Sequence, residues 1–184
     1  MPLPSPSRAP QDFALAQTGA TVLPALTSAT WAGARPTDSA YSALQQDSAT
    51  CWPMAPAPSG AAGALGVRLP RRVRVSAITI DHLPRALSHA AYGWPGSFSA
   101  SAPRRFSVYA LSGETPADAA PAAPGRRLLG SFEYDAGDDS PPVQTFHLAR
   151  PEAAQVVQLV VEDNHGNPAY TCLYRFRVHG AVAM

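Results

Sequence analysis

The fold is decided by residues 172–179, which read Cys-Leu-Tyr-Arg-Phe-Arg-Val-His. Apolar and polar side chains alternate along this stretch with a period of two, the pattern of a β-strand with one buried face. The predicted inward face carries Cys172, Tyr174, Phe176 and Val178. The predicted outward face carries Arg175, Arg177 and His179. This stretch therefore predicts a strand that packs one side against a core.

Further short strands are predicted around it, separated by Gly, Pro and Asp turns. They fall at 65–69, 72–83, 104–111, 126–135, 143–148 and 156–161. Within 72–83 the apolar residues change parity, which predicts a β-bulge near Ser76–Ala77. Helical signal is confined to 39–46, which is long enough for one or two turns. At least seven strands with few or no helices predict an all-β fold, an antiparallel β-sandwich.

The chain of 184 residues is long enough for one domain. Residues 1–11 are rich in Pro and Ser and are predicted to be a disordered lead-in, whereas 12–184 are predicted to form the sandwich. Alanine alone contributes 35 residues, which predicts a thin core. Long loops are expected at 32–41, 89–102 and 114–125.

The charge balance and hydropathy exclude several classes of protein. Fourteen basic and thirteen acidic residues give a net charge of +1, which provides no electrostatic footprint for nucleic acid. No apolar run approaches the ~18 residues that a membrane helix needs, so we expect no membrane contact by this chain itself. The first ten residues lack the apolar region of a signal peptide, and no heptad pattern predicts a coiled coil.

The sequence offers little for catalysis. It contains no G-x-S-x-G, H-x-x-x-H, C-x-x-C or Gly-rich phosphate-loop motif. Its five histidines are scattered singly, the pattern of structural hydrogen-bonding residues rather than metal ligands. The acidic run 135–139 has two interpretations, a Ca²⁺ loop or a solvated hairpin turn, and its Asp and Gly content favours the turn. We predict that the chain is not an enzyme.

Cys51 and Cys172 are the two cysteines, 121 positions apart. Two buried free thiols would suit a cytosolic protein, and a disulfide would suit an oxidising compartment. Composition alone leaves both states open.

Residues 164–180 carry a resemblance to a known family. They read Asn-His-Gly-Asn-Pro-Ala-Tyr-Thr-Cys-Leu-Tyr-Arg-Phe-Arg-Val-His-Gly, which closely resembles the N-W-G-x-P-E-Y-T-C-[IL]-Y-R-F-R-V-H-G that ends a SUN domain. Other blocks resemble the family in the same order: Asp12–Leu15, Cys51–Trp52, Thr79–Ser88, Ser101–Phe106 and Leu128–Asp135. The resemblance extends over residues 12–181, essentially the whole predicted domain.

The resemblance implies a β-sandwich of the jelly-roll or discoidin-like kind at the nuclear envelope, facing the perinuclear space. It implies a non-enzymatic module that binds the C-terminal tail of KASH proteins and bridges nucleoskeleton and cytoskeleton. Family members trimerise with the help of an upstream coiled coil, so we expect this chain alone to be monomeric or weakly trimeric.

Site residues follow from the same resemblance. It implies a disulfide between Cys51 and Cys172 and a loop that binds a monovalent cation, K⁺ or Na⁺, at Gln45, Asp47 and their neighbours. It also implies a pocket for the free carboxylate of the KASH tail. That pocket would be formed by His82, Ser101, Tyr170 and Tyr174. Imidazole and hydroxyl donors in a partly dry pocket suit a terminal carboxylate.

The sequence departs from the family at several positions. The segment between Trp31 and Cys51 is shorter than the family's hairpin lid and lacks two alternating apolar runs, so the lid is predicted to be missing or vestigial. The loop before Cys51 is about two residues short, which places the cation site in question. Thr27 stands where some members carry a cysteine that bonds to the peptide, and His165 replaces the family's Trp.

The loop 89–102 is longer than its family counterpart and contains Tyr92, Trp94 and Phe98. These aromatics have two interpretations, a substitute lid over the peptide or a cap on the thin core. Two alternative functions remain open at this point. One is a divergent SUN-like luminal domain without lid-dependent KASH binding. The other is a discoidin-like sandwich that binds carbohydrate or lipid through the same aromatics.

Overall fold

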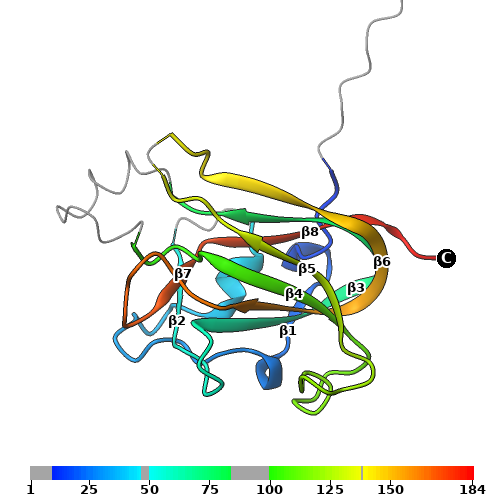
Figure 1. The fold of residues 1–184 in the computed structure, drawn as a ribbon, viewed down its shortest axis with the longest axis horizontal. Coiled ribbons are helices and arrows are strands. Elements are labelled where there is room, and N and C mark those ends of the chain that lie inside the picture. The colour runs from blue at the N-terminus through cyan, green and yellow to red at the C-terminus, as the bar shows by residue number, and fades with distance from the viewer. Residues whose placement is uncertain (1–9, 47–49, 84–99, 138) are drawn as a thin grey trace, which may run out of the picture.

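The computed structural model describes residues 10–46, 50–83, 100–137 and 139–184. This part of the chain is mostly antiparallel β-structure (Figure 1). Its strands are β1 (Thr21–Val22), β2 (Trp52–Met54), β3 (Gly63–Asp81), β4 (Arg105–Leu111), β5 (Arg127–Glu133), β6 (Val143–Val161), β7 (Thr171–Leu173) and β8 (Arg175–Val182). Three 3₁₀ helices accompany them: η1 (Ala16–Thr18), η2 (Pro24–Leu26) and η3 (Ala40–Leu44). The predicted all-β class is confirmed, and η3 lies within the predicted helical turn at 39–46.

Two strands of 19 residues each, β3 and β6, form the frame of the domain. They pair antiparallel along their length and bend together, so that each passes from one layer of the sandwich into the other (Figure 1). One layer holds β8 with the C-terminal half of β3 and the N-terminal half of β6. The other holds β1, β4 and β5 with the remaining halves. The sandwich is therefore one hydrogen-bonded sheet folded over on itself.

The prediction of four separate strands in these regions is wrong, because 65–69 joins 72–83 and 143–148 joins 156–161. The pairing register shifts between Arg68 and Val73 and again between Val75 and Ala77. Pro70 and Pro151 both fall among the unpaired residues at these breaks, where the missing N–H of proline is tolerated. A proline suggests a strand end in the sequence, but here it marks a bend inside a strand. The second break confirms the bulge predicted near Ser76.

The core between the layers contains large, fully buried side chains. They include Trp52, Phe106, Phe176, Ile78, Ile80 and Leu159. Phe106 meets Phe146 edge to face with ring centroids 5.1 Å apart, a favourable geometry for aromatic pairs. The core is therefore made chiefly by side chains on β3, β4, β6 and β8.

The predicted strand 172–179 is split at Tyr174. Its first part, β7, pairs with β2, whereas β8 pairs with β3. The predicted outward face is also partly wrong, because Arg175 and His179 are buried. The N-terminal segment covers this face of β8, with the Phe13 amide donating to the Val178 carbonyl at 2.8 Å.

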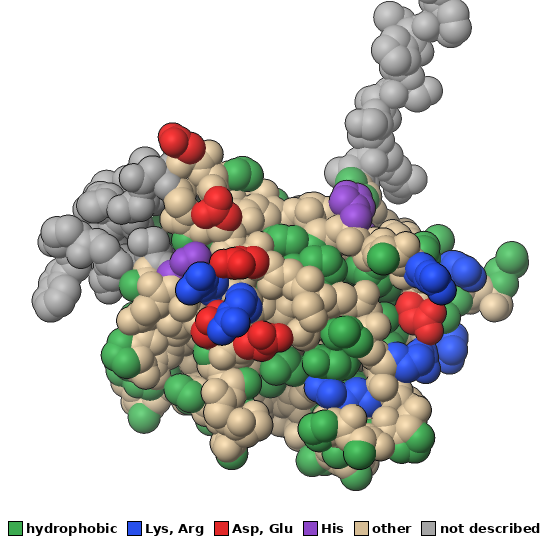
Figure 2. Space-filling model, viewed as in Figure 1, with side chains coloured by type: hydrophobic (Ala, Val, Ile, Leu, Met, Phe, Trp, Pro, Cys, Tyr) green, Lys and Arg blue, Asp and Glu red, His purple; other side chains and the backbone are tan. Residues whose placement is uncertain are grey.

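Basic and acidic side chains lie beside one another on the face shown in Figure 2 rather than in one continuous basic surface. The described residues include exposed ion pairs, such as Arg104 with Glu133 and Arg127 with Glu152. None of the short helices in the described ranges has the length and apolar character needed to cross a membrane. Of the predicted disordered lead-in 1–11, residues 1–9 lie outside the described residues, and the Gln11 carbonyl contacts His179.

Candidate functional site

The loop between β6 and β7 is organised by two asparagines. The Asn164 amide nitrogen donates to the carbonyls of Asn167 at 2.8 Å and Tyr170 at 3.1 Å. The Asn167 side-chain oxygen accepts from the amides of Ala169 and Tyr170. Gly166 has a φ of 122°, a conformation that suits glycine. Sequence reasoning quoted these residues as a family motif, and the structure shows that they fix the backbone at Tyr170.

Next to this loop, a disulfide joins Cys51 to Cys172, with the Cα atoms 5.4 Å apart. The predicted pairing is confirmed. Pro53 on β2 lies opposite Cys172 on β7, so the bond reinforces a two-stranded ladder. The Cys172 amide donates to the Ser101 carbonyl at 2.7 Å, and this bond holds the buried Ser101 against β7.

A pocket of about 370 Å³ opens beside the disulfide. Its lining comes from the segment after Thr30, from β2 and from the β7 region: Trp31, Gly33, Ala34, Arg35, Asp38, Thr50, Cys51, Pro53, Tyr170, Cys172 and Tyr174. Trp31 packs against Tyr170 with ring centroids 4.7 Å apart. Gly33 must be small here, because a Cβ atom would overlap the Trp31 indole. Trp31 gave no signal as a site residue in the sequence.

Replacing Trp31 with alanine is expected to lower the free energy of unfolding by about 1–2 kcal/mol, because the half-buried indole loses its packing on Tyr170. Urea denaturation of Trp31→Ala beside Trp31→Phe measures this, and Trp31→Phe should avoid most of the loss because it keeps a ring against Tyr170. Equal stability of Trp31→Ala and wild type would show that the stack contributes nothing.

The segment after Trp31, where the family has its lid, is compact. The Arg35 guanidinium pairs with Asp38 at 2.9 Å, and the Arg35 amide donates to the same carboxylate at 3.0 Å. The chain then enters η3, whose Ala43 and Leu44 are fully buried. Within the described positions 32–46 and 50 there is no strand. The wall of the pocket on this side is therefore a turn and a 3₁₀ helix.

His82 lies directly after β3 and is only 7% exposed. Its ring meets the Tyr174 ring edge to face, with centroids 4.9 Å apart. Nδ1 is 3.4 Å from the Leu83 carbonyl, and Nε2 has no hydrogen-bond partner among the described residues. Burial lowers the pKa of His82 to about 4, and the nearby His165 also lowers it. This buried nitrogen without a partner is an unusual feature in a folded domain.

The predicted carboxylate residues fall into two neighbouring groups. Tyr170 and Tyr174 line the pocket together, and His82 contacts Tyr174 from the side. Ser101 is 1% exposed and is connected to the others through the backbone of Cys172. His82 and Ser101 are not among the residues that line the 370 Å³ pocket.

Of the residues predicted for the cation loop and the substitute lid, the structure describes only Gln45. Gln45 ends η3, and its backbone carbonyl accepts a hydrogen bond from Arg175. Asp47, Tyr92, Trp94 and Phe98 lie outside the described residues. Within the described part of the chain, no three His, Cys, Asp or Glu side chains gather into a metal-binding cluster.

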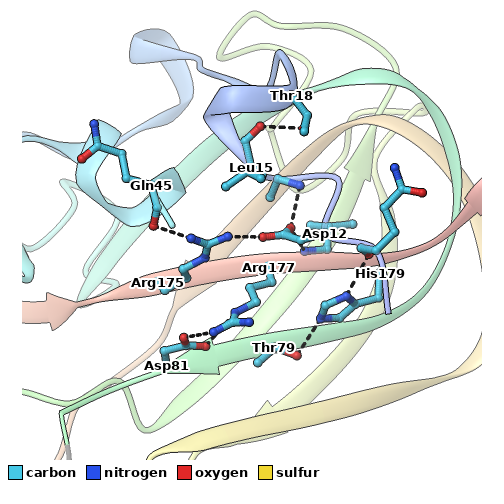
Figure 3. A network of polar contacts seen from close by, with 12 residues as sticks. Asp12, Leu15, Thr18, Gln45, Thr79, Asp81, Arg175, Arg177 and His179 are labelled. Atoms are coloured by element: carbon cyan, nitrogen blue, oxygen red, sulfur yellow. Dashed lines mark hydrogen bonds and ion pairs between the residues drawn. The ribbon is translucent and has the colours of Figure 1, made fainter. Parts of the chain in front are cut away.

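A polar network connects β8 with β3 and the N-terminal segment (Figure 3). Arg175 on β8 donates to the Asp12 carboxylate and to the Gln45 carbonyl. On the same strand, His179 contacts Thr79 at 2.8 Å and the Gln11 carbonyl at 3.0 Å. Sequence reasoning missed this network because it placed Arg175 and His179 on the outward face of the strand. Pairing and hydrogen bonding make their burial possible.

Comparison with known proteins identifies a family. The model of the Sad1 / UNC-like C-terminal family matches residues 34–182. Mouse SUN domain-containing protein 2 is 38% identical over 135 residues, which are 72% of this chain and 16% of the mouse protein. Human SUN domain-containing protein 1 is 40% identical over 133 residues, 71% of this chain and 14% of the human protein. The matched segment therefore spans a small part of the length of these relatives.

Solved structures with low sequence identity share the fold. The family 32 carbohydrate-binding module of Streptococcus pneumoniae EndoD has a TM-score of 0.60 at 16% identity, covering 92% of this chain and 99% of the module. A structure of allantoicase has a TM-score of 0.63 at 15% identity, covering 94% of this chain and 48% of allantoicase. These similarities show that the chain shares the β-sandwich fold of these proteins.

Proposed function

Because this chain belongs to the Sad1/UNC-like C-terminal family, the SUN domains, we propose that it is a non-enzymatic module that binds the C-terminal tail of a KASH protein. The binding takes place in the perinuclear space of the nuclear envelope, where the module contributes to a bridge between nucleoskeleton and cytoskeleton. Trimerisation requires a coiled coil upstream of the residues in this chain.

The observation that carries the proposal is the Nε2 atom of His82. A buried polar atom without a partner costs free energy, which a ligand recovers if it supplies the missing hydrogen bond. A C-terminal carboxylate is a suitable partner, because its charge favours a proton on Nε2, and it then accepts from that N–H and from tyrosine hydroxyls at once. His82 lies against Tyr174, which also lines the pocket, so one carboxylate near Tyr174 is within reach of both side chains.

The rest of the tail has a place in the same arrangement. The pocket beside Tyr174 is lined by Trp31, Tyr170 and Pro53, an apolar surface that suits the side chains next to the carboxylate. We propose that the carboxylate occupies the His82–Tyr174 side while the preceding residue packs on the Trp31–Tyr170 pair.

Two synthetic KASH tails that differ only at the last group test this function. Isothermal titration of the free acid and the C-terminal amide is expected to show binding that is weaker for the amide by about tenfold or more, since the amide removes the charge that the site recognises. His82→Gln should weaken binding of the free acid and reduce the difference between the two peptides. Equal affinity for acid and amide would exclude carboxylate recognition.

A second candidate is carbohydrate binding. It is favoured by the Trp31–Tyr170 pair in the pocket, because sugars stack on aromatic side chains, and by the shared fold with family 32 modules. A glycan array distinguishes the two functions: glycan signal together with no binding of either KASH tail supports the second candidate. A divergent luminal module would bind neither class of ligand.

A further inference from the structure

The end of the sandwich at which β3 and β6 bend is rich in arginine. The chain has fourteen arginines, and seven lie at or next to this bend: Arg68, Arg71, Arg72, Arg74, Arg126, Arg127 and Arg150. The acidic residues that pair with them there are Glu114 and Glu152. Figure 2 shows basic side chains gathered at this end, whereas β2 and β7, which border the peptide pocket, lie at the other end (Figure 1). The two ends of the domain therefore differ in charge.

A pocket of about 640 Å³ opens at the bend. Three arginines line it: Arg68 and Arg72 from β3 and Arg127 from β5. The pairing of β3 with β6 stops after Arg68 and resumes at Val73, so Arg72 belongs to the unpaired residues of the bend. Glu114 is the acidic side chain in the lining, which gives the lining a formal charge of +2.

Two of these arginines are held in place by carboxylates. Arg68 donates through Nε and Nη2 to Glu114. Arg127 donates through Nε to Glu152 at 2.9 Å and through Nη2 to the Ala153 carbonyl at 3.1 Å. In both arginines the third nitrogen, Nη1, donates to no described residue. Because a guanidinium has five N–H donors in a rigid fork, each of these side chains keeps donors for a ligand.

The third arginine, Arg72, has a fixed backbone and an exposed side chain. Its carbonyl accepts from the Ala183 amide at 3.0 Å, and the next residue, Val73, pairs with Val182. Its guanidinium forms no ion pair or hydrogen bond within the described part of the chain. Like charges gathered at one pocket repel one another, and an anion bound among them removes that cost.

We propose that this pocket binds the phosphate group of a phosphomonoester, supplied by a soluble molecule or by a lipid headgroup. A phosphomonoester carries a charge of about −2 near neutral pH, which matches the formal charge of the lining. Guanidinium groups bind phosphate oxygens through paired N–H donors. A single carboxylate would neutralise only half of this charge. The site does not depend on the proposed peptide binding.

The first test measures thermal melting in inorganic phosphate and in chloride at matched pH and ionic strength. The melting temperature of the wild type is expected to be higher in phosphate and to saturate with its concentration. Arg72→Gln should weaken phosphate binding by about tenfold, and Arg72→Lys, which keeps the charge but not the fork, should weaken it less.

The matched control is Arg104→Gln. Arg104 is also an exposed arginine, but it pairs with Glu133 and does not line the pocket. This variant should bind phosphate as the wild type does. An equal rise of the melting temperature in the wild type, Arg72→Gln and Arg104→Gln would show a general effect of the salt and would overturn the proposal.

Vesicles distinguish the two sources of the phosphate group. Sedimentation is measured with phosphatidylcholine vesicles that contain phosphatidic acid and with vesicles of phosphatidylcholine alone. Binding that requires phosphatidic acid and is lost in Arg72→Gln supports a lipid headgroup, and binding of inorganic phosphate without vesicle binding supports a soluble phosphomonoester. Absence of both overturns the site.

The proposed function can fail separately from this site. Arg72 does not line the peptide pocket, so Arg72→Gln should bind the free-acid KASH tail as the wild type does. If the wild type binds phosphate but no KASH tail, the proposed function fails and the phosphate site stands. If it binds the tail but not phosphate, the phosphate site fails alone.

Discussion

Reduction of the Cys51–Cys172 disulfide is expected to lower the free energy of unfolding by about 4 kcal/mol. The bond closes a loop between positions 121 apart, and a long closed loop removes much conformational freedom from the unfolded chain. The folded state also depends on the bond locally, because β2 and β7 form a ladder of only three residues each. Urea denaturation with and without reductant measures the loss.

The control is the double variant Cys51→Ala/Cys172→Ala. It should match the reduced wild type in stability, and reductant should leave it unchanged. Because both cysteines line the pocket, the double variant should, under the proposed function, also bind the KASH tail more weakly. An oxidised wild type no more stable than the double variant would show that the pocket region is held by its other contacts alone.

Acidification is expected to destabilise the domain through His82. Burial lowers the pKa of this imidazole in the folded state to about 4, against an ordinary value of 6.5. As the pH falls through this interval, the unfolded chain takes up a proton at His82 and the folded chain does not. The stability that the domain gains from keeping His82 neutral is present in full above pH 6.5. It is lost progressively as the pH falls toward 4. At 1.36 kcal/mol per pH unit, the loss is about 3 kcal/mol.

Urea denaturation between pH 7 and pH 4 isolates this contribution when wild type is compared with His82→Gln. The variant should lose less stability over the interval by about 3 kcal/mol, whereas His147→Gln, at an exposed histidine, should follow the wild type. Parallel pH profiles for wild type and His82→Gln would contradict the burial of a neutral imidazole. Under the proposed function, a bound carboxylate raises the pKa of His82, so peptide affinity should increase as the pH falls below 7.

The strands could be predicted from the sequence because alternation reports which face is buried. The joining of strands could not, because a strand that bends at Pro70 or Pro151 has the same local pattern as two strands that end there. The bulge near Ser76 was predictable, because a slip of parity is itself a sequence pattern. The sandwich could therefore be predicted from local sequence patterns. That β3 and β6 run through both layers could not, because it depends on long-range strand pairing.

The candidate site was predictable only in part. Alternation assigned Arg175 to solvent, because nothing in residues 172–179 reveals that Asp12 returns across the strand to pair with it. The resemblance indicated His82 and Tyr174, and their ring contact needed the structure. Trp31 had no signal at all, because its role arises from the position of Tyr170 in a loop set by Asn164.

Because β3 and β6 each run through both layers, the two layers share the backbone of these two strands. When the β3–β6 hydrogen bonds of one layer break, they free residues that belong to the same two strands as the other layer. The core between the layers is then exposed. We therefore expect the domain to unfold as one cooperative unit, without an intermediate in which a single layer persists. A load applied to one layer is carried along the same two strands into the other.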